Sequence, residues 1–200
     1  DTPTLTNIRV RNSSQTSRSD TWGISIQDLS SIELEDAQFD GFDTGIRINA
    51  QTRVESTPTL TNIRVRNSSQ TSRQENIGID ISGSVTAQMD DVIVEDYPFG
   101  IIYSGSLSSR DVSTPTLTNI RVRNSSQTSR NLAIGVQLSD LARVHCSDFI
   151  IEDYQIGLEI SNDTSLRDVS TPTLTNIRVR NSSQTSRYEN AGIFLGAGVG

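Results

Sequence analysis

Residues Thr2–Arg18 read TPTLTNIRVRNSSQTSR, and the same string recurs without a change from Thr57, Thr114 and Thr171. Within it, Ile8 and Val10 alternate with two arginines, which is the period-two pattern of a half-buried β-strand. Repetition at a fixed interval is the signature of a chain built from stacked units. The repeat therefore predicts a fold in which the copies and the segments between them stack on one another.

A second, weaker motif lies between the copies. It reads DAQFDGFDTGIRI from Asp36, DVIVEDYPFGIIY from Asp91 and DFIIEDYQIGLEI from Asp148. It aligns with the exact repeat, because both contain Asn or Asp, an apolar residue, any residue, an apolar residue, a charged residue, and then usually Asn or Asp. Each motif is followed by a Gly-apolar-x-apolar segment. The unit thus has 26 to 29 residues with three short strands, and seven units, the last incomplete, occupy residues 1–200 as one domain.

One unit cannot bury the apolar faces of three strands, whereas a chain that coils and stacks its turns can do so. We therefore predict an all-β parallel solenoid of about seven turns with three parallel sheets. The register puts two apolar columns inside. They are Ile8, Ala37, Ile63, Val92, Ile120, Phe149 and Ile177, and then Val10, Phe39, Val65, Val94, Val122, Ile151 and Val179.

A column that was not used to choose the register supports it. The outward residues next to the second apolar column alternate in charge at every turn, and a shift by one residue would bury them. We interpret this column as a structural charge ladder. Its members are Arg11, Asp40, Arg66, Glu95, Arg123, Glu152 and Arg180.

The unit N-I-x-V-x-N, followed by a loop and G-I-x-I, resembles the right-handed parallel β-helix repeat of the pectin-lyase-like superfamily. The resemblance covers essentially the whole chain and implies a right-handed coil. It implies no particular activity, because the superfamily includes lyases, hydrolases, epimerases, phage tailspikes and non-catalytic surface proteins, and a fold does not assign a function.

Enzymes of that fold cluster acidic residues on an outer face, and Asp40, Glu95 and Glu152 are the candidates here. Each lies between two arginines, which favours an ionised carboxylate, whereas a general acid must keep its proton. We therefore expect no catalytic residue, no metal site and no cofactor.

Several other patterns have a functional and a structural interpretation, and the structural one is favoured for each. Asp96-Tyr97 and Asp153-Tyr154 could bind sugar, but a bend followed by a core-edge tyrosine explains them. The T-x-T-x-T rows suggest ice binding, but charged residues on the intervening turns interrupt them. Cys146 is expected in the core and its neighbour His145 in solvent. The corner column from Asn12 to Asn181 is expected to form a polar ladder.

The arginines of the exact repeat are the candidate binding residues. Arg9, Arg64, Arg121 and Arg178 form an outward row, and the exposed loops add Arg18, Arg73, Arg130 and Arg187. Evenly spaced guanidinium groups suit weak, multivalent capture of an anionic polysaccharide. The alternative is that their aliphatic stems merely cover the sheet.

Composition narrows the function further. All 17 basic residues are arginine, 24 residues are acidic and the net charge is −7, which argues against a nucleic-acid partner. No apolar stretch approaches the roughly 18 residues of a membrane span. A single cysteine excludes an internal disulfide framework.

We therefore expect a non-catalytic structural or adhesive segment of an exported surface protein or filament, located outside the cell or on its surface. Its terminal turns lack caps, which predicts continuation into more chain or end-to-end stacking. Two alternatives remain open: a polysaccharide lyase, hydrolase or epimerase of the same fold, and an engineered repeat solenoid.

Overall fold

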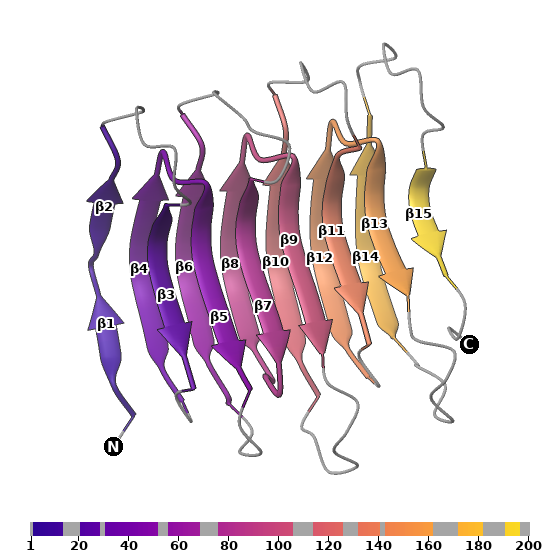
Figure 1. The fold of residues 1–200 in the computed structure, drawn as a ribbon. Coiled ribbons are helices and arrows are strands. Elements are labelled where there is room, and N and C mark those ends of the chain that lie inside the picture. Colours follow the sequence, from indigo (N-terminus) through magenta and orange to yellow (C-terminus); the bar gives the residue numbers. More distant parts are fainter. Residues whose placement is uncertain are drawn as a thin grey trace.

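Every regular element of the protein is a β-strand in the computed structural model, which describes residues 2–13, 21–28, 31–51, 56–68, 76–105, 114–125, 132–140, 143–161, 172–181 and 191–196. The strands form two parallel sheets that face one another (Figure 1). Successive strands alternate between the sheets, so the chain coils as it advances. This confirms an all-β, solenoid-like fold.

The first sheet has eight strands in the order β1-β4-β6-β8-β10-β12-β14, with β2 also paired to β4. All its pairings are parallel. Its strands are β1 (Thr4–Thr6), β2 (Arg9–Arg11), β4 (Glu33–Asp40), β6 (Thr59–Arg66), β8 (Gln88–Glu95), β10 (Thr116–Arg123), β12 (His145–Glu152) and β14 (Thr173–Arg180).

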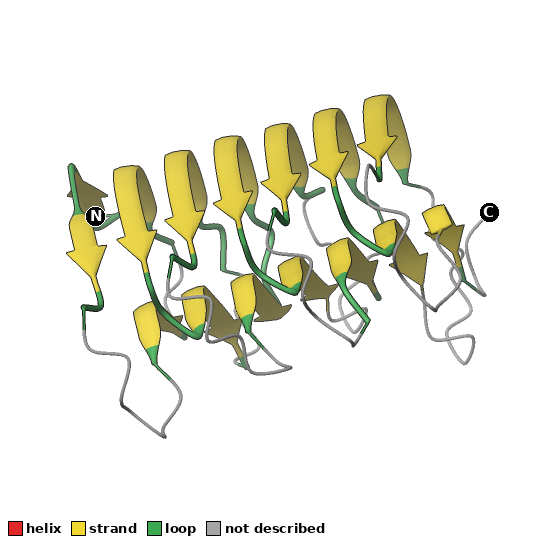
Figure 2. Cartoon of the chain, turned by 90° about the horizontal axis from the view of Figure 1, so that it is seen from above, coloured by secondary structure: helices red, strands yellow, loops and turns green. Residues whose placement is uncertain are grey.

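The second sheet has seven strands in the order β15-β13-β11-β9-β7-β5-β3, one for each of about seven turns. Viewed from above, it lies opposite the first sheet along the whole length of the molecule (Figure 2). Its strands are β3 (Trp22–Gln27), β5 (Thr44–Ala50), β7 (Ile77–Gly83), β9 (Phe99–Gly105), β11 (Ile134–Ser139), β13 (Ile156–Ser161) and β15 (Ala191–Leu195).

The prediction of a third sheet is not met by the described residues. The segments around Leu60 and Val65, which the sequence pattern separates into two strands, belong to the single strand β6. Asn62 lies between them with a φ of 53°, so the backbone bends through the left-handed region without leaving the sheet. Only in the first turn does this bend divide the strand, into β1 and β2 around Asn7.

The predicted register is confirmed. Val65 pairs with Phe39 on one side and with Val94 on the other, and the charged column is in register next to it. The side chains of these inward columns are almost fully buried in the middle turns. A shift by one residue would have moved the whole set to the solvent face.

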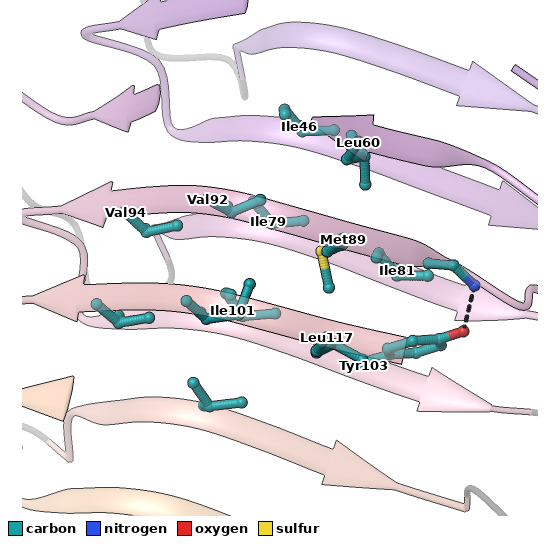
Figure 3. Packing of buried hydrophobic residues seen from close by; sticks show 14 of the residues in the cluster. Ile46, Leu60, Ile79, Ile81, Met89, Val92, Val94, Ile101, Tyr103 and Leu117 are labelled. Atoms are coloured by element: carbon teal, nitrogen blue, oxygen red, sulfur yellow. Dashed lines mark hydrogen bonds between the residues drawn. The ribbon is translucent and has the colours of Figure 1, made fainter. Parts of the chain in front are cut away.

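The core lies between the two sheets and consists mainly of stacked aliphatic side chains, with buried phenylalanines and tyrosines among them (Figure 3). Tyr103 brings a hydroxyl group into this core, and the dashed line in Figure 3 marks one of its hydrogen bonds. The hydroxyl donates to the carbonyl of Val85 at 2.6 Å and accepts from the amide of Ala87 at 2.9 Å. A buried tyrosine hydroxyl normally needs such a partner.

A column of glycines sets how closely the two sheets approach. The glycine of each G-I-x-I segment faces a valine or isoleucine in the first sheet from Gly45 onward, up to Gly157. A Cβ placed on Gly78 would lie 2.2 Å from Cγ1 of Val94 and 2.5 Å from the carbonyl oxygen of Gly100. The glycines are therefore required by close packing and not by a turn.

We predict that Gly78→Ala lowers the free energy of unfolding by about 1–3 kcal/mol, because the added methyl group overpacks the core. The Cβ would meet a backbone oxygen as well as Val94, so a change of side-chain rotamer cannot relieve the clash. Urea denaturation followed by circular dichroism measures the difference.

Gly192→Ala is the matched control, since Gly192 occupies the same column and has no atom within 4 Å of the added Cβ. Its stability should stay within about 0.5 kcal/mol of the parent. Equal losses in the two variants would show that glycine flexibility, and not the approach of the sheets, explains the column.

Candidate functional site

The predicted binding arginines lie together on the outer face of the eight-stranded sheet. Arg64 pairs in register with Gln38 and Ile93, and the same column continues in both directions through the sheet. We call this column the arginine row. Its members are Arg9, Gln38, Arg64, Ile93, Arg121, Ile150 and Arg178. An arginine recurs every second turn, a spacing of about 9.6 Å.

The loop arginines Arg18, Arg73, Arg130 and Arg187 lie outside the described residues. The candidate site is therefore built from the strands alone. Within the arginine row, each of the four arginines is exposed, whereas Ile93 and Ile150 are partly covered.

The charge ladder has the predicted register, but only some of its members form ion pairs along it. Arg11 and Asp40 meet at 3.6 Å between Nε and Oδ2. Glu95 is bound instead by Arg64 of the arginine row, at 2.8 Å from Nη2 to Oε2. The guanidinium groups are half or more exposed, so each pair contributes little to stability.

Two other ladder arginines turn toward the corner of the coil. Arg66 Nε lies 3.5 Å from Asp96 Oδ2, and Arg123 Nε lies 3.9 Å from the equivalent oxygen of Asp153. Arg9, Arg121 and Arg178 form no ion pair within the part of the chain that the structure describes. These three guanidinium groups have the freest access to an outside ligand.

A polar ladder that the sequence analysis did not predict lies within the strands of the first sheet. It follows the left-handed residues in the middle of the strands, where Asn and Asp alternate from turn to turn. Asn176 donates from Nδ2 to Asp148 Oδ1 at 2.5 Å, and Asn62 donates to Asp36 in the same way. The column is Asn7, Asp36, Asn62, Asp91, Asn119, Asp148 and Asn176.

The corner column from Asn12 to Asn181, which the sequence predicts to form a polar ladder, makes main-chain bonds to the next turn, such as that from Asn67 N to Glu95 O at 3.1 Å. Asn181 donates its side-chain amide to the carbonyl of Tyr154 at 3.0 Å, so this amide binds backbone. Asn67 begins an Asn-Ser-Ser sequence, which matches the N-glycosylation sequon, but its side chain is fully buried and is therefore inaccessible to a glycosylating enzyme in the folded protein.

The Asp-Tyr pairs are not available for sugar binding. Tyr97 and Tyr154 are buried, deeper than the core edge predicted for them, and Tyr97 donates its hydroxyl to the carbonyl of Phe42 at 3.1 Å. Burial raises the pKa of both tyrosines above the ordinary range. Asp96 takes a φ of 66° at the bend, as expected of a corner residue, and its Oδ1 accepts from the amide of Ser125 at 3.1 Å.

The threonine rows are interrupted as predicted. Thr59 is followed in register by Gln88, and Thr61 by Asp90, so hydroxyl groups do not recur on every turn. At the other end of the sheet, Thr4 donates its hydroxyl to Glu33 at 3.0 Å. These rows do not provide the regular hydroxyl array that ice binding would need.

A charged cluster on the second sheet was missed by the sequence analysis. Arg47 lies 3.6 Å from Asp80 and stacks 5.8 Å from the ring centroid of Trp22. Burial raises the pKa of the Asp80 carboxyl, and the neighbouring Arg47 opposes part of that rise. The three residues come from successive turns, which the alignment of turns could have revealed.

The described residues contain no group of three or more metal-ligating side chains that could hold an ion. They also include no helix long and apolar enough to cross a membrane. Comparisons with known protein families, with curated proteins and with solved structures found no match. The surface must therefore be interpreted from its own geometry.

Cys146 lies in the inward column as predicted, where it is 1% exposed, and its neighbour His145 faces solvent. Burial raises the pKa of the Cys146 thiol to about 12. We predict that the native protein does not react with a thiol-specific disulfide reagent at about pH 8, and that denaturant exposes one reactive thiol.

A variant that combines His145→Cys with Cys146→Ala is the matched control, because it moves the thiol by one residue to the opposite face. It should react in the native state within the mixing time. Rapid labelling of the parent would contradict the inward orientation of Cys146.

Proposed function

We propose that the chain is a non-catalytic structural and adhesive segment of an exported surface protein or filament. In this role it is a stiff rod that repeats one surface at fixed intervals. The observation that supports it is the position of the four identical segments. They supply β1 with β2, β6, β10 and β14, which are alternate turns of one sheet in continuous parallel register.

The handedness of the coil and its relation to a superfamily are part of the same proposal. We infer a right-handed parallel β-helix related to the pectin-lyase-like superfamily. Its support is that parallel strands of one sheet joined by a crossover connection are right-handed in about 98% of cases. β4 and β6 are such a pair, with β5 of the opposite sheet between them in the chain.

Growth of the rod is supported at its last described turn. Ile193, Phe194 and Leu195 of β15 are between 47% and 57% exposed, although their columns are buried elsewhere or half-covered. Another turn would bury Ile193 and Leu195 and cover part of Phe194, whether it came from more chain or from a second molecule. Either source gives the continuation that a filament needs.

Adhesion is assigned to the arginine row. Its arginines recur at about 9.6 Å along a straight face, so an extended anionic polysaccharide could contact several of them at once. Each contact is weak in water, and the sum is made effective by multivalency. The chain's overall negative charge opposes binding elsewhere on the surface.

We predict that the protein binds polygalacturonate in a salt-dependent manner, and that Arg9→Gln, Arg121→Gln and Arg178→Gln together weaken binding by about tenfold or more. Three multivalent contacts worth about 0.5 kcal/mol each give that factor. Biolayer interferometry on immobilised polymer, at several salt concentrations, measures it.

Arg47→Gln is the matched control, because this arginine lies on the second sheet. It should leave the affinity unchanged. Equal losses in the two variants would reject the arginine row as the contact surface. Release of shortened, unsaturated or reducing ends from the polymer would instead favour the enzyme alternative and overturn the non-catalytic role.

A further inference from the structure

The outer face of the eight-stranded sheet is divided lengthwise by charge. The column of left-handed Asn and Asp residues runs along its middle. We call the strand residues after this column the basic half, and the column together with the strand residues before it the acidic half. The basic half carries Arg9, Arg11, Arg64, Arg66, Arg121, Arg123, Arg178 and Arg180.

The acidic half carries six exposed carboxylates, and no arginine lies on its strand residues. They are Glu33, Glu35, Asp36, Asp90, Asp91 and Asp148. Four of them accept a hydrogen bond from a neutral side chain, namely Thr4, Asn62, Asn119 or Asn176, but these six form no ion pair with any described residue. This half therefore keeps a net negative charge.

The basic half is only partly neutralised by its own acids. Five carboxylates lie on it or at its corner, fewer than its eight arginines. They are Asp40, Glu95, Asp96, Glu152 and Asp153. Opposite net charges thus lie side by side along the whole length of one face.

We propose that this face binds the same face of a second copy of the chain, with the two rods parallel and pointing in the same direction. Charge selects that arrangement. Rotating one copy by 180° about the solenoid axis places its acidic half over the basic half of the other copy. Rotating it about the strand direction would place like charges together, which costs several kcal/mol.

The face has the dimensions of a stable interface. Seven turns extend about 30 Å along the axis, and strands of eight residues extend about 25 Å across it. The resulting area of about 750 Å² per copy is close to the roughly 800 Å² that each partner buries in a standard complex. Figure 2 shows that one face of this sheet is turned toward the second sheet and that the opposite, outer face is turned away from it.

The order of charges along the axis specifies the alignment further. Arginines of the basic half come from turns made by the exact repeat, and carboxylates of the acidic half come from the turns between them. A displacement of one turn, about 4.8 Å, therefore places arginine turns of one copy opposite acidic turns of the other. Each copy then presents its arginine turns to the acidic turns of the other copy, so both copies contribute the same kinds of contact.

Sedimentation velocity at low ionic strength tests the proposal, with two charge-reversed variants. One changes the acidic half, Glu33→Lys with Glu35→Lys and Gln88→Lys, and the other changes Arg9, Arg121 and Arg178 to Glu. The parent should sediment with twice the 21.9 kDa chain mass and dissociate in about 1 M NaCl, where the Debye length is about 3 Å.

Each charge-reversed variant should self-associate about tenfold more weakly or not at all, and a mixture of the two should form dimers again. All three substituted residues of each set are exposed, and circular dichroism verifies the folds. A monomeric parent, or variants that dimerise as well as the parent, would overturn the proposal.

Crosslinking determines the direction of the rods. In a Cys146→Ala background, Thr6→Cys should crosslink to itself across the dimer through a short bifunctional thiol reagent, because the first turns of the two copies lie within one turn of each other. A crosslink that forms only between Thr6→Cys and Thr175→Cys chains would mean antiparallel rods and would reject this arrangement. The acidic-half variant keeps every arginine and uncovers the arginine row when its dimer is lost, so loss of the dimer with retained or stronger polygalacturonate binding separates this inference from the proposed adhesive function.

Discussion

Main-chain hydrogen bonding between successive turns is the constraint on which the structure depends. Because each turn pairs in parallel with the turns before and after it, the position of one residue determines the column of every equivalent residue. Inward columns must then be apolar and outward columns compatible with their own neighbours about 4.8 Å away. A residue in this fold is therefore selected by the turn on each side more than by its neighbours in sequence.

Two kinds of turn alternate along the chain, and this alternation places complementary side chains next to each other in the outward columns. The exact repeat supplies Asn to the left-handed column and Arg to the charge ladder. The turns between the repeats supply Asp to the left-handed column and Asp or Glu to the charge ladder. Stacked like charges would repel at this spacing, whereas alternating ones attract. Asn62 bound to Asp36 and Arg11 bound to Asp40 are the same solution in two columns.

The sequence predicted the inward columns, the opposite orientations of Cys146 and His145, and the exposed arginine row. It did not predict that two strand segments join across Asn62, because apolar residues alternate equally well around a corner or a bend. Nor did it predict that Arg64 would bind Glu95, since a long arginine side chain can reach diagonally to the next turn. Backbone register follows from pattern, whereas the partner of a flexible side chain requires coordinates.

The boundary between the basic half and the acidic half runs along the solenoid axis and crosses every strand, so the width of each half does not depend on the number of turns. Adding a pair of turns extends both halves together and leaves their geometry unchanged. The number of contacts available to a polymer or to a second rod then increases with the number of turns, while each contact stays weak. Identical repeats favour this arrangement, because every second turn must offer the same group at the same height for the contacts to act together.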